Sequence, residues 1–191
     1  IKIEKEGKVR HTPYSVLNPP SEKGKIDLCL DIIEHGFSSP VLRDTKVGQE
    51  LEISGPFGNF IFNEKDAEKE HWLIGTGTGM VPLYSMIKEF VPRLPDHQFV
   101  LLEGVQTEKD LLLHQELTKF SESHDNFQYM PTLSRETWTG KTGRVQRHLE
   151  NEDLRHKTFY ICGLKEMVTE TRELLMKKGV PGNKIYFERF N

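Results

Sequence analysis

The chain has 191 residues, 36% apolar residues and a formal charge of −3, which are ordinary values for a globular protein. At about 100 to 200 residues per domain, this length allows one large domain or two small ones. There is no basic excess to neutralise a nucleic acid and no uncharged apolar stretch long enough for a membrane span, so neither partner is expected. Cys29 and Cys162 cannot form a disulfide framework or a four-cysteine iron–sulfur cluster. With no signal peptide at the start, they indicate a reducing, cytoplasmic compartment, and no metal site is expected.

The first third of the chain has the alternation that is typical of β-strands. Polar and apolar side chains alternate over Ile26–Ile32 and Glu50–Ile53, and Pro–Pro, Lys–Gly and Val–Gly dipeptides separate these segments. The one helix expected in this region is short and covers Ser38–Arg43. The pattern predicts a small antiparallel β-barrel. A polar stretch, Phe62–His71, then indicates a domain boundary.

Residues 70–191 alternate between short apolar segments and helical patterns, whereas residues 1–69 form the predicted barrel domain. The expected strands are Trp72–Ile74, Phe99–Leu102, Phe127–Met130, Thr158–Ile161 and Lys184–Phe187. The expected helices are Val81–Phe90, Glu108–Phe120 with a capping box at Thr107 and Asp110, Arg144–Leu149 and Leu164–Lys178. This alternation predicts a five-stranded parallel, doubly wound sheet with helices on both faces. In the order 3-2-1-4-5 the first and fourth strands are neighbours, and ligands bind beyond their carboxyl ends.

A glycine-rich loop follows the first of these strands. Its sequence is Gly75-Thr76-Gly77-Thr78-Gly79, and Pro82 lies in the helix that comes next. Glycines between a strand and a helix allow the backbone to approach a pyrophosphate, whose charge then meets the helix N-terminus. The alternative is a glycine-rich turn that serves packing alone.

The fourth strand ends at a second small residue. Gly163 leaves room for a flat ring, and Cys162 offers a soft wall beside it, so that two glycine-bearing strand ends would face each other across one slot. The alternative for Cys162 is a buried thiol that acts as a small apolar side chain.

Three polar residues near the end of the third strand indicate the nucleotide. Ser134, Arg135 and Arg144 together form a plausible seat for the 2'-phosphate of NADP, because a guanidinium matches phosphate geometry. Taken separately, each arginine is better explained as a solvated surface residue, and it is their shared placement that supports the phosphate site. Glu103 near the end of the second strand is a rival, since an acid there would bind the ribose 2'-hydroxyl of NAD. We favour NADP, with NAD as the alternative.

Taken together, the motifs resemble those of the ferredoxin–NADP reductase superfamily, over residues from Val9 to Asn191. Its members join an FAD-binding β-barrel to a nucleotide-binding α/β domain. Tyr14 and Ser15 match the end of the flavin motif Arg-x-Tyr-Ser, which implies a tyrosine on one flavin face and a hydroxyl near flavin N5. Thr12 stands where the family has its arginine, and Arg10 is the candidate for a flavin phosphate.

Further motifs support the resemblance in the same order along the chain. The turn Gly-Pro-x-Gly-x-Phe is matched by Gly55, Pro56, Gly58 and Phe60, and His35–Ser39 matches a loop that faces the flavin diphosphate. The pyrophosphate loop is matched by Gly75, Thr76, Gly77, Thr78, Gly79 and Pro82, and the 2'-phosphate motif by Ser134 and Arg135. Cys162 and Gly163 match the segment beside the nicotinamide. At the end of the chain, Glu188 is implied as an active-site acid and Phe190 as the cover of the second flavin face, followed here by an additional Asn191.

The resemblance implies hydride transfer between NADP(H) and FAD, with Ser15, Cys162 and Glu188 in catalytic roles and with Phe190 moving aside for the nicotinamide. Electrons would pass to or from a ferredoxin, a flavodoxin or an oxygenase component. The alternatives are an NADH-dependent oxygenase reductase or cytochrome b5 reductase-like enzyme and, in another class, a non-catalytic dinucleotide-binding regulatory subunit. Because residues 1–69 are few for the family's barrel, we expect the first barrel strands to be missing.

Overall fold

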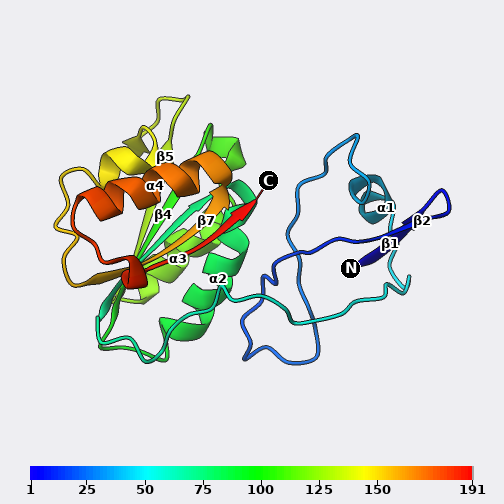
Figure 1. Cartoon of the computed structure of the whole chain (residues 1–191), viewed down its shortest axis with the longest axis horizontal. Helices are drawn as coiled ribbons and strands as arrows, with labels where there is room; N and C mark the ends of the chain where they lie inside the picture. The colour runs from blue at the N-terminus through cyan, green and yellow to red at the C-terminus, as the bar shows by residue number, and fades with distance from the viewer. Residues whose placement is uncertain (191) are drawn as a thin grey trace.

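The computed structural model describes residues 1–190, which form two parts joined by an extended segment (Figure 1). The first part contains a hairpin of β1 (Lys2–Lys5) and β2 (Lys8–His11) and one short helix, α1 (Ser39–Arg43). The hairpin turn is formed by Glu6 and Gly7, both at positive φ, as a tight two-residue turn between antiparallel strands requires. Helix α1 confirms the short helix expected over Ser38–Arg43.

The two strands predicted later in this part do not form. Ile26–Ile32 and Glu50–Ile53 are not strands, and each has a single backbone hydrogen bond to a distant segment: Asp27 accepts from Leu17 N–H at 2.8 Å, and Glu52 accepts from Lys2 N–H at 2.9 Å. A β-strand needs a continuous ladder to a neighbour, and alternation of side chains alone does not supply one. Among residues 1–69 the structure thus has a two-stranded antiparallel sheet in place of the expected barrel.

The second part is a parallel sheet in the order β6-β5-β4-β3-β7-β8. Its strands are β3 (Glu70–Thr76), β4 (Gln98–Val105), β5 (Phe127–Leu133), β6 (Lys141–Thr142), β7 (Lys157–Leu164) and β8 (Ile185–Phe190). The predicted order of the five main strands is confirmed, and β6 adds a short strand at the edge beside β5. The predicted fold class, a two-part α+β protein with an antiparallel β region followed by a parallel doubly wound α/β sheet, is confirmed, although the antiparallel region is a small sheet where a barrel was predicted.

The helices that cover this sheet differ from the prediction at two places. As expected, α2 (Met80–Phe90) follows β3 and α4 (Lys165–Lys177) follows β7. The single helix expected over Glu108–Phe120 is wrong, because it divides into a 3-10 turn, η2 (Glu108–Asp110), and α3 (His114–Ser123). The remaining 3-10 turns are η1 (Gly77–Gly79), η3 (Val145–His148), where an α-helix was expected, and η4 (Gly182–Lys184).

The break before α3 has a local cause. Leu113 has a φ of 55°, in the left-handed region, and Leu111 is extended. Between them, the Leu112 N–H donates to Glu103 Oε1 at 2.9 Å and so leaves the helical hydrogen-bond pattern. The predicted capping box of Thr107 and Asp110 is present, but it caps the η2 turn.

Both faces of the sheet are buried, as in most parallel sheets. On β3, Trp72 and Ile74 join the core cluster under α4, whereas Leu73 joins the cluster under α2 and α3. Each fully buried side chain of this size contributes about 1.5 to 3 kcal/mol. Within residues 1–190, no helix is both long enough and apolar enough to cross a membrane.

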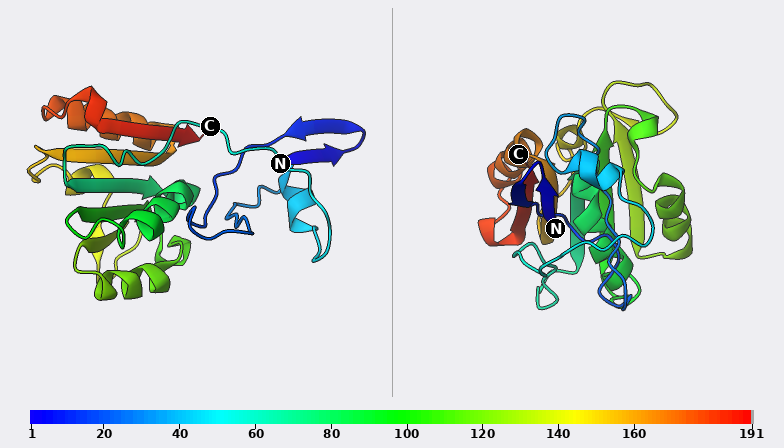
Figure 2. Two further views of the ribbon diagram at one scale, coloured as in Figure 1. Left: turned by 90° about the horizontal axis from the view of Figure 1, so that it is seen from below. Right: turned by 90° about the vertical axis from the view of Figure 1, so that its right-hand side faces the viewer.

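The segment predicted to be a polar boundary is packed against the sheet. Phe62 is only 8% exposed and stacks on Phe90 and Tyr160, with ring centroids 4.3 and 5.2 Å away. Asn63 donates from its backbone to Tyr160 Oη and from its side chain to Tyr186 Oη. These contacts fix the first part so that the carboxyl ends of β3, β7 and β8 point toward it (Figure 2).

We predict that Phe62→Ala lowers the free energy of unfolding by about 3 kcal/mol, because it leaves a cavity beside the Phe90 and Tyr160 rings. Phe57→Ala is the matched control, since Phe57 is 87% exposed and its removal leaves no cavity. Urea unfolding measures both variants. Equal stability of the two would contradict the anchoring role of Phe62.

Candidate functional site

The glycine loop lies at the carboxyl end of β3 and leads through η1 into α2. Gly77 has a φ of +53°, which a residue with a side chain rarely adopts. Gly79 has helical angles but no space for a side chain, because a Cβ there would lie 2.2 Å from the Cys162 carbonyl oxygen. The loop therefore touches the backbone of β7 directly.

The end of β7 is equally crowded. A Cβ on Gly163 would lie 2.3 Å from Thr76 Oγ1, and Gly163 itself has a φ of +145°. The two glycine-bearing strand ends were expected to face each other across a slot. That expectation is wrong, because Gly79 and Gly163 pack against one another, and a flat ring has to lie beyond them.

The loop has the features that a pyrophosphate requires. No side chain caps the N-terminus of α2 in the described structure, so its first N–H groups have no side-chain acceptor. Thr76 Oγ1 is buried without a hydrogen-bond partner beside Gly163. Thr78 is half-buried in the loop, and Pro82 lies in the first turn of α2. These groups fit a bound dinucleotide.

Cys162 and Glu188 are register partners on β7 and β8. The thiol is fully buried in the core cluster under α2, and burial raises its pKa, with a further contribution from the Glu188 charge. A protonated, enclosed thiol contributes packing and is a poor nucleophile. Burial also raises the pKa of Glu188, which is half-buried.

Phe190 is half-buried at the end of β8, and Asn191 lies outside the described residues.

Glu103 does not reach a ribose. Strand β4 continues to Val105, so Glu103 lies within the strand and its side chain is fully buried. The Glu103 carboxylate accepts hydrogen bonds from Leu112 N–H and from Tyr129 Oη. Burial raises the pKa of Glu103 to about 7. The rival interpretation of Glu103 as the NAD-binding acid is therefore wrong, and the residue instead fixes the chain before α3.

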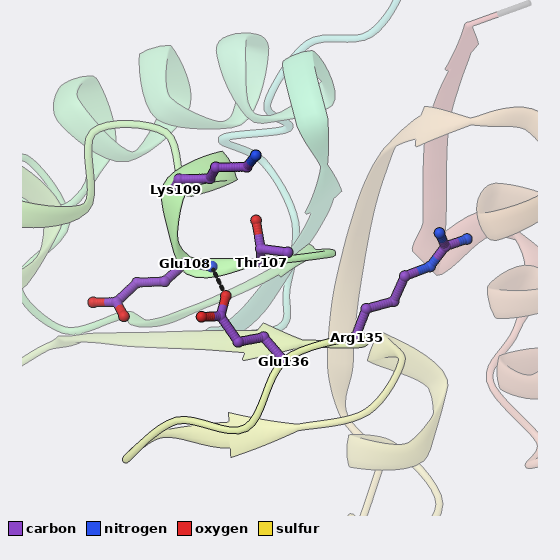
Figure 3. Close-up of a pocket in the computed structure, with 5 residues that line it drawn as sticks. All are labelled: Thr107, Glu108, Lys109, Arg135 and Glu136. Atoms are coloured by element: carbon purple, nitrogen blue, oxygen red, sulfur yellow. Dashed lines mark hydrogen bonds between the residues drawn. The ribbon is translucent and has the colours of Figure 1, made fainter.

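A pocket of about 600 Å³ opens beyond β4 and β5, where the adenosine end of a dinucleotide is expected. It is lined by Thr107, Glu108, Lys109, Arg135 and Glu136 (Figure 3). Arg135 thus lies where the sequence indicated. The hydroxyl of Ser134, its neighbour, is already engaged, because it donates to the Val105 carbonyl at 3.1 Å.

Arg144 does not join Arg135 in this pocket. Its guanidinium lies 3.7 Å from Glu170 of α4, since the backbone enters η3 at this residue and directs the side chain toward that helix. The predicted convergence of the two arginines is therefore not found.

The flavin-side candidates gather around α1. The Arg10 guanidinium stacks on the Phe37 ring at 4.5 Å, and Thr12 Oγ1 and Ser38 Oγ share a hydrogen bond of 2.6 Å. These contacts bring Arg10 to the loop that the resemblance assigned to the flavin diphosphate. Tyr14 and Ser15 are half-buried on the segment after β2.

The expected flavin turn is open to solvent. Gly55, Pro56 and Gly58 are exposed, and Gly58 has a φ of +112°, so it needs to be glycine. Phe60 packs edge-on against Tyr160 with ring centroids 6.4 Å apart, and so it links the turn to the sheet.

Comparisons with known proteins match both parts of the chain. Residues 73–173 match the model of the oxidoreductase NAD-binding domain, and residues 1–62 match that of the oxidoreductase FAD-binding domain. The chain belongs to the ferredoxin–NADP reductase superfamily. FAD and a nicotinamide dinucleotide are the cofactors of these domains. The division at residues 69 and 70 stays a prediction.

Curated relatives of this superfamily member include electron-transfer proteins. The anthranilate 1,2-dioxygenase electron transfer component of Acinetobacter baylyi is 30% identical, and the match covers 93% of this chain and 52% of that protein. Ferredoxin–NADP reductase B of Sorangium cellulosum is 29% identical, with 93% and 77% covered. The chain thus spans about half the length of the first relative and about three quarters of the second.

Solved structures share the fold of this superfamily member. The Amycolatopsis cytochrome P450 reductase GcoB has a TM-score of 0.87 at 24% identity, with 97% of this chain and 57% of that chain covered. The ferredoxin NADP⁺ reductase from Neisseria gonorrhoeae with bound FAD and NADP has a TM-score of 0.81 at 19% identity, with 98% and 83% covered.

Of the residues that line the pocket beyond β4 and β5, only Arg135 was predicted from the sequence as a site residue. Glu136 follows Ser134 and Arg135 directly, and Thr107 to Lys109 follow the neighbouring strand. In this superfamily fold β4 and β5 are neighbours, so the residues that follow them lie at the same edge of the sheet. The position of Glu136 directly after β5 could therefore have indicated it as a pocket residue.

We predict that Gly79→Ala lowers the free energy of unfolding by about 1 to 3 kcal/mol, because its Cβ overlaps the Cys162 carbonyl and both backbones have to move. Gly182→Ala is the control, since no atom lies within 4 Å of a Cβ built there. Urea unfolding compares the two. The close approach of the loop to β7 is refuted if both variants match the unchanged protein.

We predict a pH-dependent gain in stability for Glu103→Gln. The folded-state pKa of Glu103 is about 7, above the 4.5 of an unperturbed glutamate, so the native carboxyl stabilises the fold fully below pH 4.5 and this contribution is lost as pH rises through 7. The stability of the variant relative to the unchanged protein should therefore rise over this window by about 2 to 3 kcal/mol. Urea unfolding at several pH values measures it, with exposed Glu152→Gln as the control. A difference that is independent of pH would contradict the burial of an ionisable carboxyl.

Proposed function

We propose that this chain is the flavin- and nucleotide-binding part of a reductase that transfers a hydride between NAD(P)H and FAD and exchanges single electrons with a redox protein. The partner would be a ferredoxin, a flavodoxin or an oxygenase component. The observation that carries the proposal is the direct contact of the glycine loop with Cys162 and Gly163, with Glu188 on the next strand. The cytoplasmic location is part of this proposal.

The chain's residues have distinct tasks in this reaction. The loop Gly75–Gly79 and the N-terminus of α2 hold the pyrophosphate, so that the nicotinamide reaches the end of β7. Because the backbones of Gly79, Cys162 and Gly163 pack closely, the end of β7 presents a flat surface that orients the nicotinamide ring. When bound, the nicotinamide and the flavin supply the hydride chemistry themselves. Orientation at contact distance is the protein's main contribution.

Polar groups around the rings complete the site. Glu188 is half-buried, burial raises the pKa of its carboxyl, and the group lies where it can hydrogen-bond to the rings. Ser15 would donate a hydrogen bond to the flavin ring, and Tyr14 would stack on one of its faces. Arg10, held over Phe37, would bind the flavin diphosphate. Phe190 would cover the other flavin face and would move aside for the nicotinamide.

Two alternatives differ in ways that are measurable. The first is an NADH-dependent oxygenase reductase, and its oxygenase role is supported by relatives such as the phenol 2-monooxygenase reductase component DmpP of Pseudomonas sp., 27% identical over 186 residues. A regulatory subunit that binds a dinucleotide without flavin would have the same α/β part. The oxygenase reductase would carry out the same hydride transfer to FAD, whereas a regulatory subunit without flavin could not.

We predict that the purified chain binds added FAD and that NADH or NADPH bleaches the flavin absorbance under anaerobic conditions. Glu188→Gln should slow this reduction by about 10- to 100-fold at unchanged FAD content, because a carboxyl beside the rings is lost. Glu173→Gln, an exposed position of α4, is the control. A chain that binds a dinucleotide but no flavin would favour the regulatory subunit and refute the proposal.

A further inference from the structure

The pocket beyond β4 and β5 is not a cationic site. Its lining has two basic side chains, Lys109 and Arg135, and two acidic ones, Glu108 and Glu136, so that their formal charges cancel. A 2'-phosphate carries up to two negative charges and is bound in proteins mostly by arginine and lysine clusters. The charge of this pocket therefore offers such a group no net attraction.

Glu136 is held in place in this pocket. Its Oε2 accepts a hydrogen bond of 2.8 Å from the Glu108 N–H, which links the chain after β5 to the chain after β4 (Figure 3). Its own backbone is also fixed, because Ser134 N–H donates to the Val105 carbonyl and Arg135 N–H to the Gln106 carbonyl. A carboxylate that is held in this way stays at the pocket when a ligand enters.

Arg135 does not neutralise this carboxylate. Figure 3 shows the Arg135 side chain pointing away from Glu136 and from the residues after β4. Arg144, the second arginine expected at a 2'-phosphate, faces Glu170, and the Ser134 hydroxyl donates to the Val105 carbonyl. Of the three groups expected to bind the phosphate, Arg135 alone lines the pocket.

We propose that Glu136 is a specificity-determining residue that disfavours a 2'-phosphate and accepts a hydrogen bond from a ribose 2'-hydroxyl. The chain then prefers NADH to NADPH, the reverse of the preference that Ser134 and Arg135 indicated in the sequence. This inference rests on the proposed function in one respect, since it places the adenosine end of the nucleotide beyond β4 and β5. It does not depend on flavin binding or on hydride transfer.

The test uses two ligands that represent the adenosine end alone, 5'-AMP and 2',5'-ADP, with affinities measured by calorimetry. Glu136→Gln keeps an acceptor for the Glu108 N–H but removes the charge. We expect this variant to raise the affinity for 2',5'-ADP relative to 5'-AMP by about tenfold at low salt, because one repulsive carboxylate is lost. The gain should shrink at high salt, which screens exposed charges.

Glu152→Gln is the matched control, as it removes an exposed acid from the loop before β7, at the opposite end of the sheet. An unchanged ratio in Glu136→Gln, or the same change in the control, overturns the proposal. So does failure of both ligands to bind the unchanged chain, because the adenosine end then lies elsewhere. If the ratio shifts but neither NADH nor NADPH reduces bound FAD, the proposed function fails and the role of Glu136 stands.

Discussion

The contact between Gly79 and the Cys162–Gly163 peptide determines how the carboxyl edge of the sheet is built. β3 and β7 are neighbours, with Gly75 opposite Cys162, so the chain that leaves β3 has to pass directly over the end of β7. It can do so only where neither backbone carries a side chain, because any Cβ would lie closer to its neighbour than real contacts allow. This constraint places the N-terminus of α2, which has no side-chain cap, over the strand ends, where we propose that a dinucleotide pyrophosphate binds.

The other parts of the candidate site are positioned by the same sheet. Strand β8 pairs with β7 and brings Glu188 to the edge, while β4 and β5 on the other side form the pocket of Arg135 and Glu136. The first part of the chain is held toward this edge by Phe62, which is buried between α2 and β7 rings. The nicotinamide end, the pyrophosphate loop and the adenosine end that we propose thus lie along one edge, in the order that a dinucleotide requires.

Much of the second part could be predicted from the sequence, because the spacing of apolar residues and the glycine loop report on backbone geometry. The strand order followed from βαβ alternation. The directions of side chains could not be predicted in this way. Glu103 and Arg144 were predicted as possible ligands, but Glu103 is buried and accepts a hydrogen bond from Leu112 N–H, and Arg144 faces Glu170. The division of the predicted helix over Glu108–Phe120 depends on a left-handed Leu113, which no local pattern indicates. Alternation over Ile26–Ile32 predicted a strand, yet alternation says nothing about whether a neighbouring strand exists.

Amide hydrogen exchange with and without NAD⁺ tests most directly whether this edge binds a dinucleotide. The account predicts slower exchange at the amides of residues 77–81, where the loop enters α2, and at Gly163, whose backbone closes against it. Exchange in β1 and β2, which lie far from the loop in sequence and form a separate sheet, should stay unchanged. Protection confined to β1, β2 or the amino ends of the parallel strands, with none in the loop, would contradict the account.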